Sequence, residues 1–229
     1  MSPRTLARTA GLFYLLTIIT GGVAFALAEK LFVVRDGAAT VANLLGRESL
    51  MYLGFATNLL SSVCYIAVTA LFYRIFKAVD ATTSLAAAFF SLVGCAIGAI
   101  SVLFYVAPMA ILHSAKFQAI FSATQIQELV LLSFRLSARC TNIGFVFFGV
   151  YCLLIGTLIV RATFLPRVVG MLMLFAGLGW LTFLWPPLVN ALAPFNFLPG
   201  FVGEATLTFW LLIAGVNAER WTLQAGASQ

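Results

Sequence analysis

The chain has 229 residues, of which 62% are hydrophobic and 9% charged, and its mean hydropathy is +1.07. Soluble domains carry roughly a quarter of their residues as charges, so this composition excludes an ordinary soluble domain and indicates an integral membrane protein. The net charge of +6 comes from 13 Lys and Arg residues placed singly at the ends of apolar runs, which excludes the basic patch of a nucleic-acid-binding protein.

Six apolar stretches are predicted to cross the membrane as helices. Each is close to the ~20 residues that span a hydrocarbon core of ~30 Å. The expected fold is therefore an all-α polytopic membrane helix bundle, with 1–229 as a single transmembrane domain. The predicted spans are residues 9–28, 50–73, 84–112, 143–160 with an outer extension 124–142, 166–185 and 201–218.

The first span resembles a signal peptide, because Arg4 and Arg8 precede an apolar run that ends in "ALA" at 26–28. Its apolar run is longer than the 7–15 residues of a signal-peptide core, so we expect it to be retained as a helix. The connection that follows, Asp36 to Ser49, has a capping residue and good helix formers, which predicts a short interfacial helix.

The second span carries a polar stripe, since its polar residues are spaced 3, 4, 7 and 11 apart and share one face of a helix. This stripe is equally consistent with interhelical hydrogen bonds and with the lining of a pocket. The third span has small residues that favour close helix approach, and His113 stands at its end. The stripe consists of Asn58, Ser61, Ser62, Tyr65 and Thr69.

The fourth span has an amphipathic extension in which Glu128, Arg135, Arg139 and Asn142 lie on one helical face. Counting back from Arg161 places Arg139 at the outer membrane boundary, so the helix overshoots the membrane. The broad apolar arc of the extension predicts that it packs against protein with the polar stripe facing inward. In the alternative, the arginines extend to lipid phosphates.

The sixth span contains Glu204 about one turn from its outer end. An ionisable residue at that depth is costly unless it is paired, so we expect Glu204 to face the bundle interior and to pair with Arg139. Residues 185–200, "WPPLVNALAPFNFLPG", hold four prolines and no charge, and predict a stiff apolar outer loop.

The basic residues also predict the orientation of the chain. The short connections between spans two and three and between spans four and five are basic, whereas the longer connections mix both signs. The positive-inside rule then places both termini in the cytoplasm. The four cysteines lie in or beside apolar stretches without paired spacing, so each is expected to be a free thiol, and neither a metal nor a cofactor is expected.

Three stretches of the sequence together are typical of one family: "RTAGLFYLLTIITGG", "NIGFVFFGVYCLLIGTLIVRATFLPRVVGMLMLFAGLGWL" and "LPGFVGEATLTFWLLIAGVN". With them the sequence resembles the DUF4386 family of prokaryotic integral membrane proteins, and the resemblance covers nearly the whole chain. It implies an uncleaved multi-helix protein of the cytoplasmic (inner) membrane, in a family with no assigned activity. Relatives often carry an acid where Asn142 stands and a histidine where Tyr151 stands, so the resemblance implies that this chain lacks two groups suited to acid–base or metal chemistry.

Three functions remain open from the sequence. The first is binding of an anionic or amphipathic small molecule, or of a lipid headgroup, in a polar pocket of the outer half. The second is a membrane-embedded enzyme acting on a lipid or isoprenoid, with Glu204 as general acid or base and Tyr65 or His113 assisting. The third is a structural or assembly subunit. The expected partners are membrane lipids, and the predicted ligand-binding residues are Arg135, Arg139, Asn142, Glu204, Asn58 and Tyr65.

Overall fold

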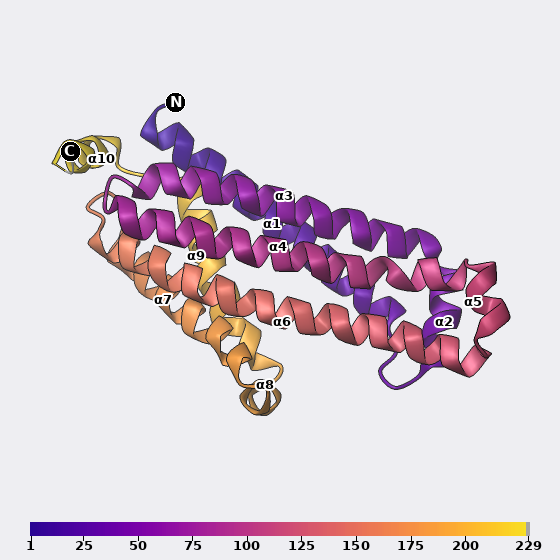
Figure 1. Ribbon diagram of the computed structural model, residues 1–229. Helices are drawn as coiled ribbons and strands as arrows, with labels where there is room; N and C mark the ends of the chain where they lie inside the picture. Colours follow the sequence, from indigo (N-terminus) through magenta and orange to yellow (C-terminus); the bar gives the residue numbers. More distant parts are fainter. Residues whose placement is uncertain (228–229) are drawn as a thin grey trace. The chain divides into compact units, whose positions relative to one another are not determined.

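The computed structural model describes residues 1–227 of the chain (Figure 1). Within that range it contains ten α-helices, two 3-10 helices and no strand. Six segments are long and apolar enough to cross a membrane, which confirms the predicted all-α polytopic bundle. They are α1 (Pro3–Leu31), α3 (Glu48–Phe76), α4 (Ala81–Leu112), α6 (Ala123–Arg161), α7 (Arg167–Leu181) with η1 (Thr182–Leu184), and η2 (Phe195–Phe197) with α9 (Leu198–Ile213).

Helix α6 contains both the fourth predicted span and its extension. Its 39 residues form one uninterrupted helix. At 1.5 Å per residue such a helix is roughly 58 Å long, which is nearly twice the thickness of the hydrocarbon core. The prediction that this helix extends well beyond one membrane thickness is therefore confirmed.

The connections contain shorter helices. The predicted short helix between the first two spans is confirmed as α2 (Gly37–Gly46), where the Asp36 side chain accepts a hydrogen bond of 2.8 Å from the backbone N–H of Ala39. Its position at the membrane interface stays a prediction. Helix α5 (Ala115–Ile120) follows α4. The predicted loop 185–200 instead contains α8 (Pro186–Leu192) and η2, so the prediction of a stiff loop missed its helical turns.

The sixth span begins and ends earlier in the chain than predicted. Helix α9 ends at Ile213, and Gly215 adopts a φ of 70°, a left-handed conformation that commonly ends a helix at glycine. The prediction that this span continues to Ala218 was therefore wrong. A further amphipathic helix that was not predicted, α10 (Ala218–Ala227), follows the glycine.

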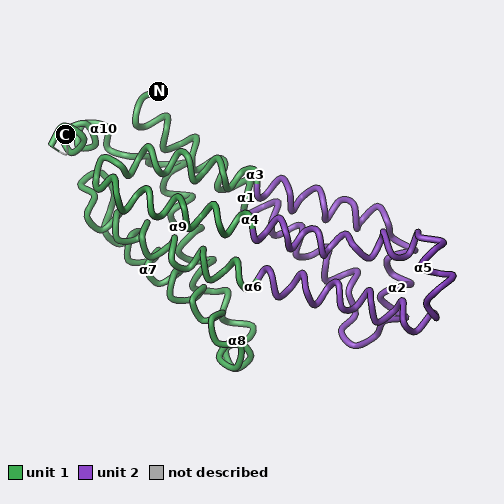
Figure 2. Tube along the Cα trace, viewed as in Figure 1, with its two compact units in different colours: residues 1–17, 63–96, 142–229 green, residues 18–62, 97–141 purple. Residues whose placement is uncertain are grey.

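The residues group into two compact units, which are coloured in Figure 2. Unit 1 comprises residues 1–17, 63–96 and 142–229, and unit 2 comprises residues 18–62 and 97–141. Helices α1, α3, α4 and α6 contribute residues to both units. All contacts described below lie within one unit.

In unit 1, glycines allow close approach of α6 and α7. Gly149 lies opposite Gly177, and two turns along, Gly156 lies opposite Gly170. A Cβ atom on Gly156 would stand 2.9 Å from the carbonyl oxygen of Gly170, so no larger residue fits without movement of the backbone. The close approach fixes the position of α7, which carries one of the residues of the site described below.

Unit 2 has an apolar core and a small hydroxyl cluster. The Ser101 hydroxyl lies within 2.7–3.0 Å of the Ser137 carbonyl oxygen and of the hydroxyls of Ser137 and Thr141. At the end of α4, His113 Nε2 lies 3.1 Å from Glu48 Oε1. The apolar core is formed by Leu31, Leu44, Met51, Tyr105, Met109, Leu112, Val130 and Phe134.

Candidate functional site

Glu204 in α9 is held against α7 by two glycines that precede it. A Cβ atom on Gly203 would collide with the carbonyl oxygen of Leu172, and one on Gly200 would enter the indole ring of Trp180. Because neither glycine has a side chain, α9 approaches α7 closely enough for the Glu204 carboxylate to reach Trp180. The local sequence "GFVGE" thus positions the carboxylate.

The Glu204 carboxylate accepts hydrogen bonds from residues on three other helices. The Tyr14 hydroxyl of α1 donates to Oε2 at 2.9 Å, and the Trp180 indole N–H of α7 donates to Oε1 at 2.6 Å. The Cys152 thiol of α6 is a weak donor to Oε1 at 3.9 Å. Hydrogen bonds to a charged acceptor are worth about 1.5–3 kcal/mol each, so this carboxylate helps to hold four helices together.

No cation accompanies this carboxylate within unit 1. Among the residues that the structure describes, the ion pairs are His113 with Glu48 and Arg161 with Asp80. Tyr14 and Cys152 are fully buried, and the Glu204 residue as a whole is half-buried. An intramembrane carboxylate held only by neutral donors is unusual, since such groups generally pair with a charge or face a functional site.

Two further tyrosines adjoin this cluster. Tyr65 packs edge-on against Tyr14 with ring centroids 5.6 Å apart, and Tyr151 packs against Tyr65 at 5.9 Å. Both are close enough to interact with the Glu204 charge. Their buried hydroxyls have no hydrogen-bond partner among residues 1–227, and the Tyr65 hydroxyl lies toward Tyr14 without meeting hydrogen-bond geometry. Leaving such a group unpaired costs about 1–3 kcal/mol, so each needs a donor or acceptor from elsewhere.

Aromatic rings fix the orientation of Trp180. Phe145 stacks on the indole with ring centroids 4.6 Å apart, and Phe183 and Phe197 close the sides at 6.2 Å and 6.0 Å. A ring packed in this way has few alternative rotamers, so its N–H stays directed at the carboxylate. We refer to Glu204, Tyr14, Trp180, Cys152, Tyr65 and Tyr151 as the carboxylate cluster.

The structure brings two of the six predicted site residues together, because Tyr65 and Glu204 both belong to the carboxylate cluster. Asn142 lies half-buried in the same unit. Asn58 belongs to unit 2, where its side chain donates to the Gly54 carbonyl oxygen of its own helix at 2.9 Å.

The two arginines of α6 do not turn into the core of unit 2. Arg135 and Arg139 are exposed, and the face of this segment that is buried carries Ser133 and Ser137. The predicted inward direction of the arginine stripe was therefore wrong, because small hydroxyl residues pack against α4 where the arginines would be too large. Pairing of Arg139 with Glu204 joins residues of different units and stays a prediction.

Tyr14, Trp180 and Cys152 were not predicted as partners of Glu204, and Tyr151 was not predicted as a member of the cluster. A signal for the first two was present, because a buried Tyr or Trp in a membrane span needs an acceptor for its O–H or N–H. Glu204 offers such an acceptor, but only a cation was predicted as its partner. Cys152 was predicted as an inert buried thiol, and it is free and buried.

Six segments that are long and apolar enough to cross a membrane define the class: this is a multi-pass membrane protein. The chain belongs to the DUF4386 family, described as a domain of unknown function, whose family model matches residues 9–215. Comparison with curated proteins and comparison with solved structures each give no match. The family resemblance predicted from the sequence is thereby confirmed.

Proposed function

We propose that this membrane protein binds an amphipathic small molecule or lipid whose polar group hydrogen-bonds to the carboxylate cluster. One observation carries the proposal: the Glu204 carboxylate is fixed by Tyr14 and Trp180, forms no ion pair with the described residues of its unit, and adjoins the two unpartnered hydroxyls of Tyr65 and Tyr151. A purely structural polar cluster would satisfy its own groups. The carboxylate keeps one lone pair that could accept from a ligand, and the two buried hydroxyls beside it have no partner.

The charge of the cluster favours one kind of ligand. A carboxylate repels an anion and attracts a cation or a hydrogen-bond donor. The ligand polar group is therefore an amine or a hydroxyl rather than a phosphate or carboxylate. Recognition of an anion by this protein would depend on Arg135 and Arg139 in unit 2, and their role in binding stays a separate proposal.

The ligand would reach the cluster from the bilayer. Glu204 is half-buried, and its neighbours on α9, Phe201 and Phe209, are 63% and 52% exposed. In a membrane span such exposed aromatic side chains contact lipid tails. An amphipathic molecule can therefore place its polar group at Glu204 while its apolar part stays in the hydrocarbon.

Native mass spectrometry of protein extracted in a mild detergent tests this proposal. We expect the wild-type protein to retain a bound amphipath and Glu204→Gln to lose most of it, since a neutral amide attracts a donor more weakly. The control is Glu29→Gln, which alters an exposed glutamate. Equal retention by wild type and Glu204→Gln, or no retained molecule in either, would refute the proposal and favour a structural or assembly role.

An enzyme acting on a lipid or isoprenoid is the second candidate. The observation that favours it is the Tyr14–Glu204 contact of 2.9 Å, which places two titratable groups within hydrogen-bond reach. Tyr14 thus takes the assisting role predicted for Tyr65 or His113. If Glu204→Gln retains its bound lipid but in a chemical form different from that in wild type, the result would support an enzyme in place of a protein that only binds the lipid.

We further propose that the protein resides in the cytoplasmic membrane with both termini in the cytoplasm. The support is the distribution of basic residues, which cluster in the short connections that hold Arg74 and Lys77 or Arg161 and Arg167. A fluorescent-protein fusion at the C-terminus, which folds only in the cytoplasm, should be bright. A C-terminal fluorescent fusion without fluorescence, together with an active periplasmic phosphatase fusion at the same end, would show that the C-terminus lies outside the cytoplasm.

A further inference from the structure

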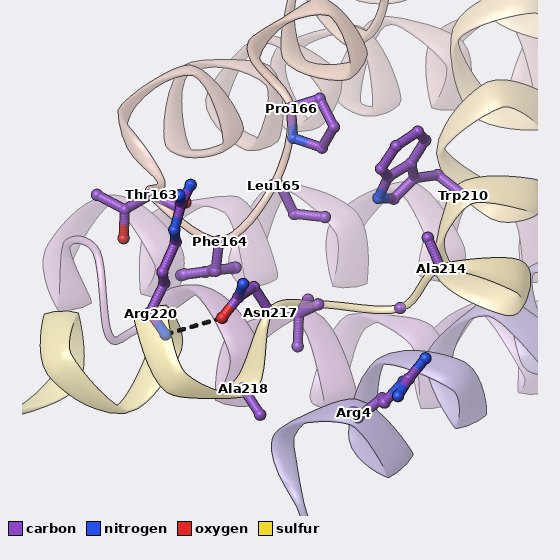
Figure 3. Close-up of a pocket in the computed structure, with 12 residues that line it drawn as sticks. Arg4, Thr163, Phe164, Leu165, Pro166, Trp210, Ala214, Asn217, Ala218 and Arg220 are labelled. Atoms are coloured by element: carbon purple, nitrogen blue, oxygen red, sulfur yellow. Dashed lines mark hydrogen bonds between the residues drawn. The ribbon is translucent and has the colours of Figure 1, made fainter.

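We propose that unit 1 has a second binding site, which holds the phosphate of an anionic phospholipid headgroup between Arg4 and Arg220. A cavity of about 550 Å³ opens between the start of α1, the connection from α6 to α7, and the connection from α9 to α10 (Figure 3). A volume of this size accommodates a small ligand. This site involves none of the residues of the carboxylate cluster.

The lining of the cavity contains both cationic and apolar side chains. Of its twelve lining residues, two are arginines and none is acidic. Phe164, Leu165 and Trp210 supply apolar surface. This combination fits a molecule with an anionic head and an apolar body, and fits a free inorganic anion less well.

The guanidinium of Arg4 is available for a ligand. No hydrogen bond or ion pair joins it to any of the residues that the structure describes, and its side chain lies beside Gly215. Arg8, one turn further along α1, is already used, because it donates to the Ile213 carbonyl oxygen at 3.2 Å. Of the two arginines near the start of α1, Arg4 is therefore the one whose guanidinium can bind a phosphate.

The other wall of the cavity is preformed by hydrogen bonds. Asn217 caps α10 by accepting from the backbone N–H of Arg220 at 3.0 Å, the dashed line in Figure 3, and its own N–H donates to the Phe164 carbonyl oxygen at 3.2 Å. Arg220 Nη1 donates to the Thr163 carbonyl oxygen at 3.4 Å. Arg220 is thus held at the cavity with N–H groups to spare, since a guanidinium has five.

Gly215 keeps this region open. Its φ of 70° favours glycine, and a Cβ there would lie 3.2 Å from Arg4 Cγ. The backbone N–H of Gly215 donates to the Trp210 carbonyl oxygen at 3.0 Å and closes the end of α9. The turn at Gly215 therefore creates both the end of the helix and the space beside Arg4.

The cavity lies where lipid phosphates are expected. The spans α1, α6, α7 and α9 all begin or end beside it, at Pro3, Arg161, Arg167 and Ile213. Ends of membrane spans mark the interface, and Trp210 has the amphipathic ring that is enriched there. A phospholipid could therefore place its phosphate between the arginines while its acyl chains remain in the bilayer.

Lipid titration by native mass spectrometry tests the site on the full-length protein. We expect dioleoyl phosphatidylglycerol to bind wild type more tightly than dioleoyl phosphatidylcholine, and Arg4→Gln and Arg220→Gln each to weaken phosphatidylglycerol binding about tenfold, the value of one charge-assisted hydrogen bond. The control is Arg74→Gln, an exposed arginine in the last turn of α3 that does not line the cavity.

Several outcomes would overturn the proposal. One is wild-type affinity in Arg4→Gln, and another is an equal loss in Arg74→Gln, which would indicate general attraction to a basic surface. Displacement of phosphatidylglycerol by inorganic phosphate at equal concentration would show a site for the free ion instead. A measurement on wild type alone serves as a second test: phosphatidylglycerol must raise the melting temperature more than phosphatidylcholine does.

Discussion

The polar clusters of the two units differ in how completely they satisfy themselves. In unit 2 the Ser101 hydroxyl bonds to Ser137 and Thr141, and Thr141 also donates to the Ser137 carbonyl oxygen of its own helix at 3.1 Å. Every member is neutral and has a partner nearby. In unit 1 a carboxylate has only neutral donors, and two adjoining tyrosine hydroxyls have no partner in residues 1–227.

This difference separates a structural cluster from a candidate site. Ser and Thr hydroxyls can bond to a carbonyl oxygen one turn back in their own helix. A hydroxyl cluster can therefore satisfy its own hydrogen bonds, and it links helices with a modest gain in stability. A carboxylate has no such local solution, and its presence in apolar helices requires donors from other helices. The predictions below are designed to break or sharpen this contrast.

The largest effect is expected from Gly203→Leu. The new side chain would collide with the Leu172 carbonyl oxygen and force α9 away from α7, which removes the Trp180–Glu204 hydrogen bond. We expect a loss of about 3 kcal/mol or more in the free energy of unfolding, together with loss of the bound amphipath. Chemical denaturation in mixed micelles measures the loss in the free energy of unfolding, and native mass spectrometry measures the loss of the amphipath. The control is Gly98→Ala, because open space surrounds Gly98, and this change should be neutral or stabilising.

A smaller loss is expected from Trp180→Phe. The ring still packs on Phe145, but the N–H donor to the carboxylate is gone, which should lower the free energy of unfolding by about 2 kcal/mol. Trp185→Phe, at a position that is 64% exposed, provides the matched control and should change little. Equal melting temperatures for the two variants would mean that the carboxylate hardly depends on Trp180.

Ser101→Ala probes the other side of the comparison. It removes one neutral hydroxyl, and Thr141 keeps its bond to the Ser137 carbonyl oxygen, so we expect a loss of only about 1 kcal/mol. Thermal melting in detergent measures this loss. Retention of the bound amphipath should be the same as in wild type. A marked loss of ligand from Ser101→Ala would contradict the assignment of the unit 2 cluster as structural.

The smallest effect concerns Asp80, a carboxylate at the exposed start of α4. Hydrogen bonds from the backbone N–H and the hydroxyl of Thr83, with a lesser attraction from Arg161, hold its pKa below the usual value. A lowered folded pKa means that the stabilisation is complete above about pH 3.9 and is lost as the pH falls through the folded pKa.

Asp80→Asn should therefore lower the melting temperature at neutral pH by less than about 2 °C, because asparagine caps a helix nearly as well. The difference from wild type should disappear in acid. Melting curves at both pH values test this, and a difference that grows in acid would contradict it. The small size expected here contrasts with the larger role of the half-buried Glu204.

Much of the fold could be predicted from the sequence. Hydropathy located all six spans, and the unbroken amphipathic pattern before Asn142 indicated that α6 is one long helix. The end of α9 was missed because Gly215 lies within an apolar run, where a single glycine does not reveal its φ. Helix α10 was missed because a short amphipathic segment carries little hydropathy signal.

The site was predicted only in part. Glu204 stood out because a carboxylate in an apolar span is costly. The depth of a residue along its helix does not say which way it faces or which helices are neighbours, so Tyr14 and Trp180 could not be assigned to it. The arginines stand out by their charge, yet Arg135 and Arg139 are exposed in unit 2, and the α6 residue that bonds to α4 is Ser137.

The most direct test of the central claim is to return the co-purifying amphipath to protein from which it has been removed. A ligand that binds the folded state raises the melting temperature according to its affinity. We predict a rise for wild type and for Ser101→Ala, and little or none for Glu204→Gln. An equal rise in all three proteins would contradict the account, because it would show that the molecule binds without the carboxylate.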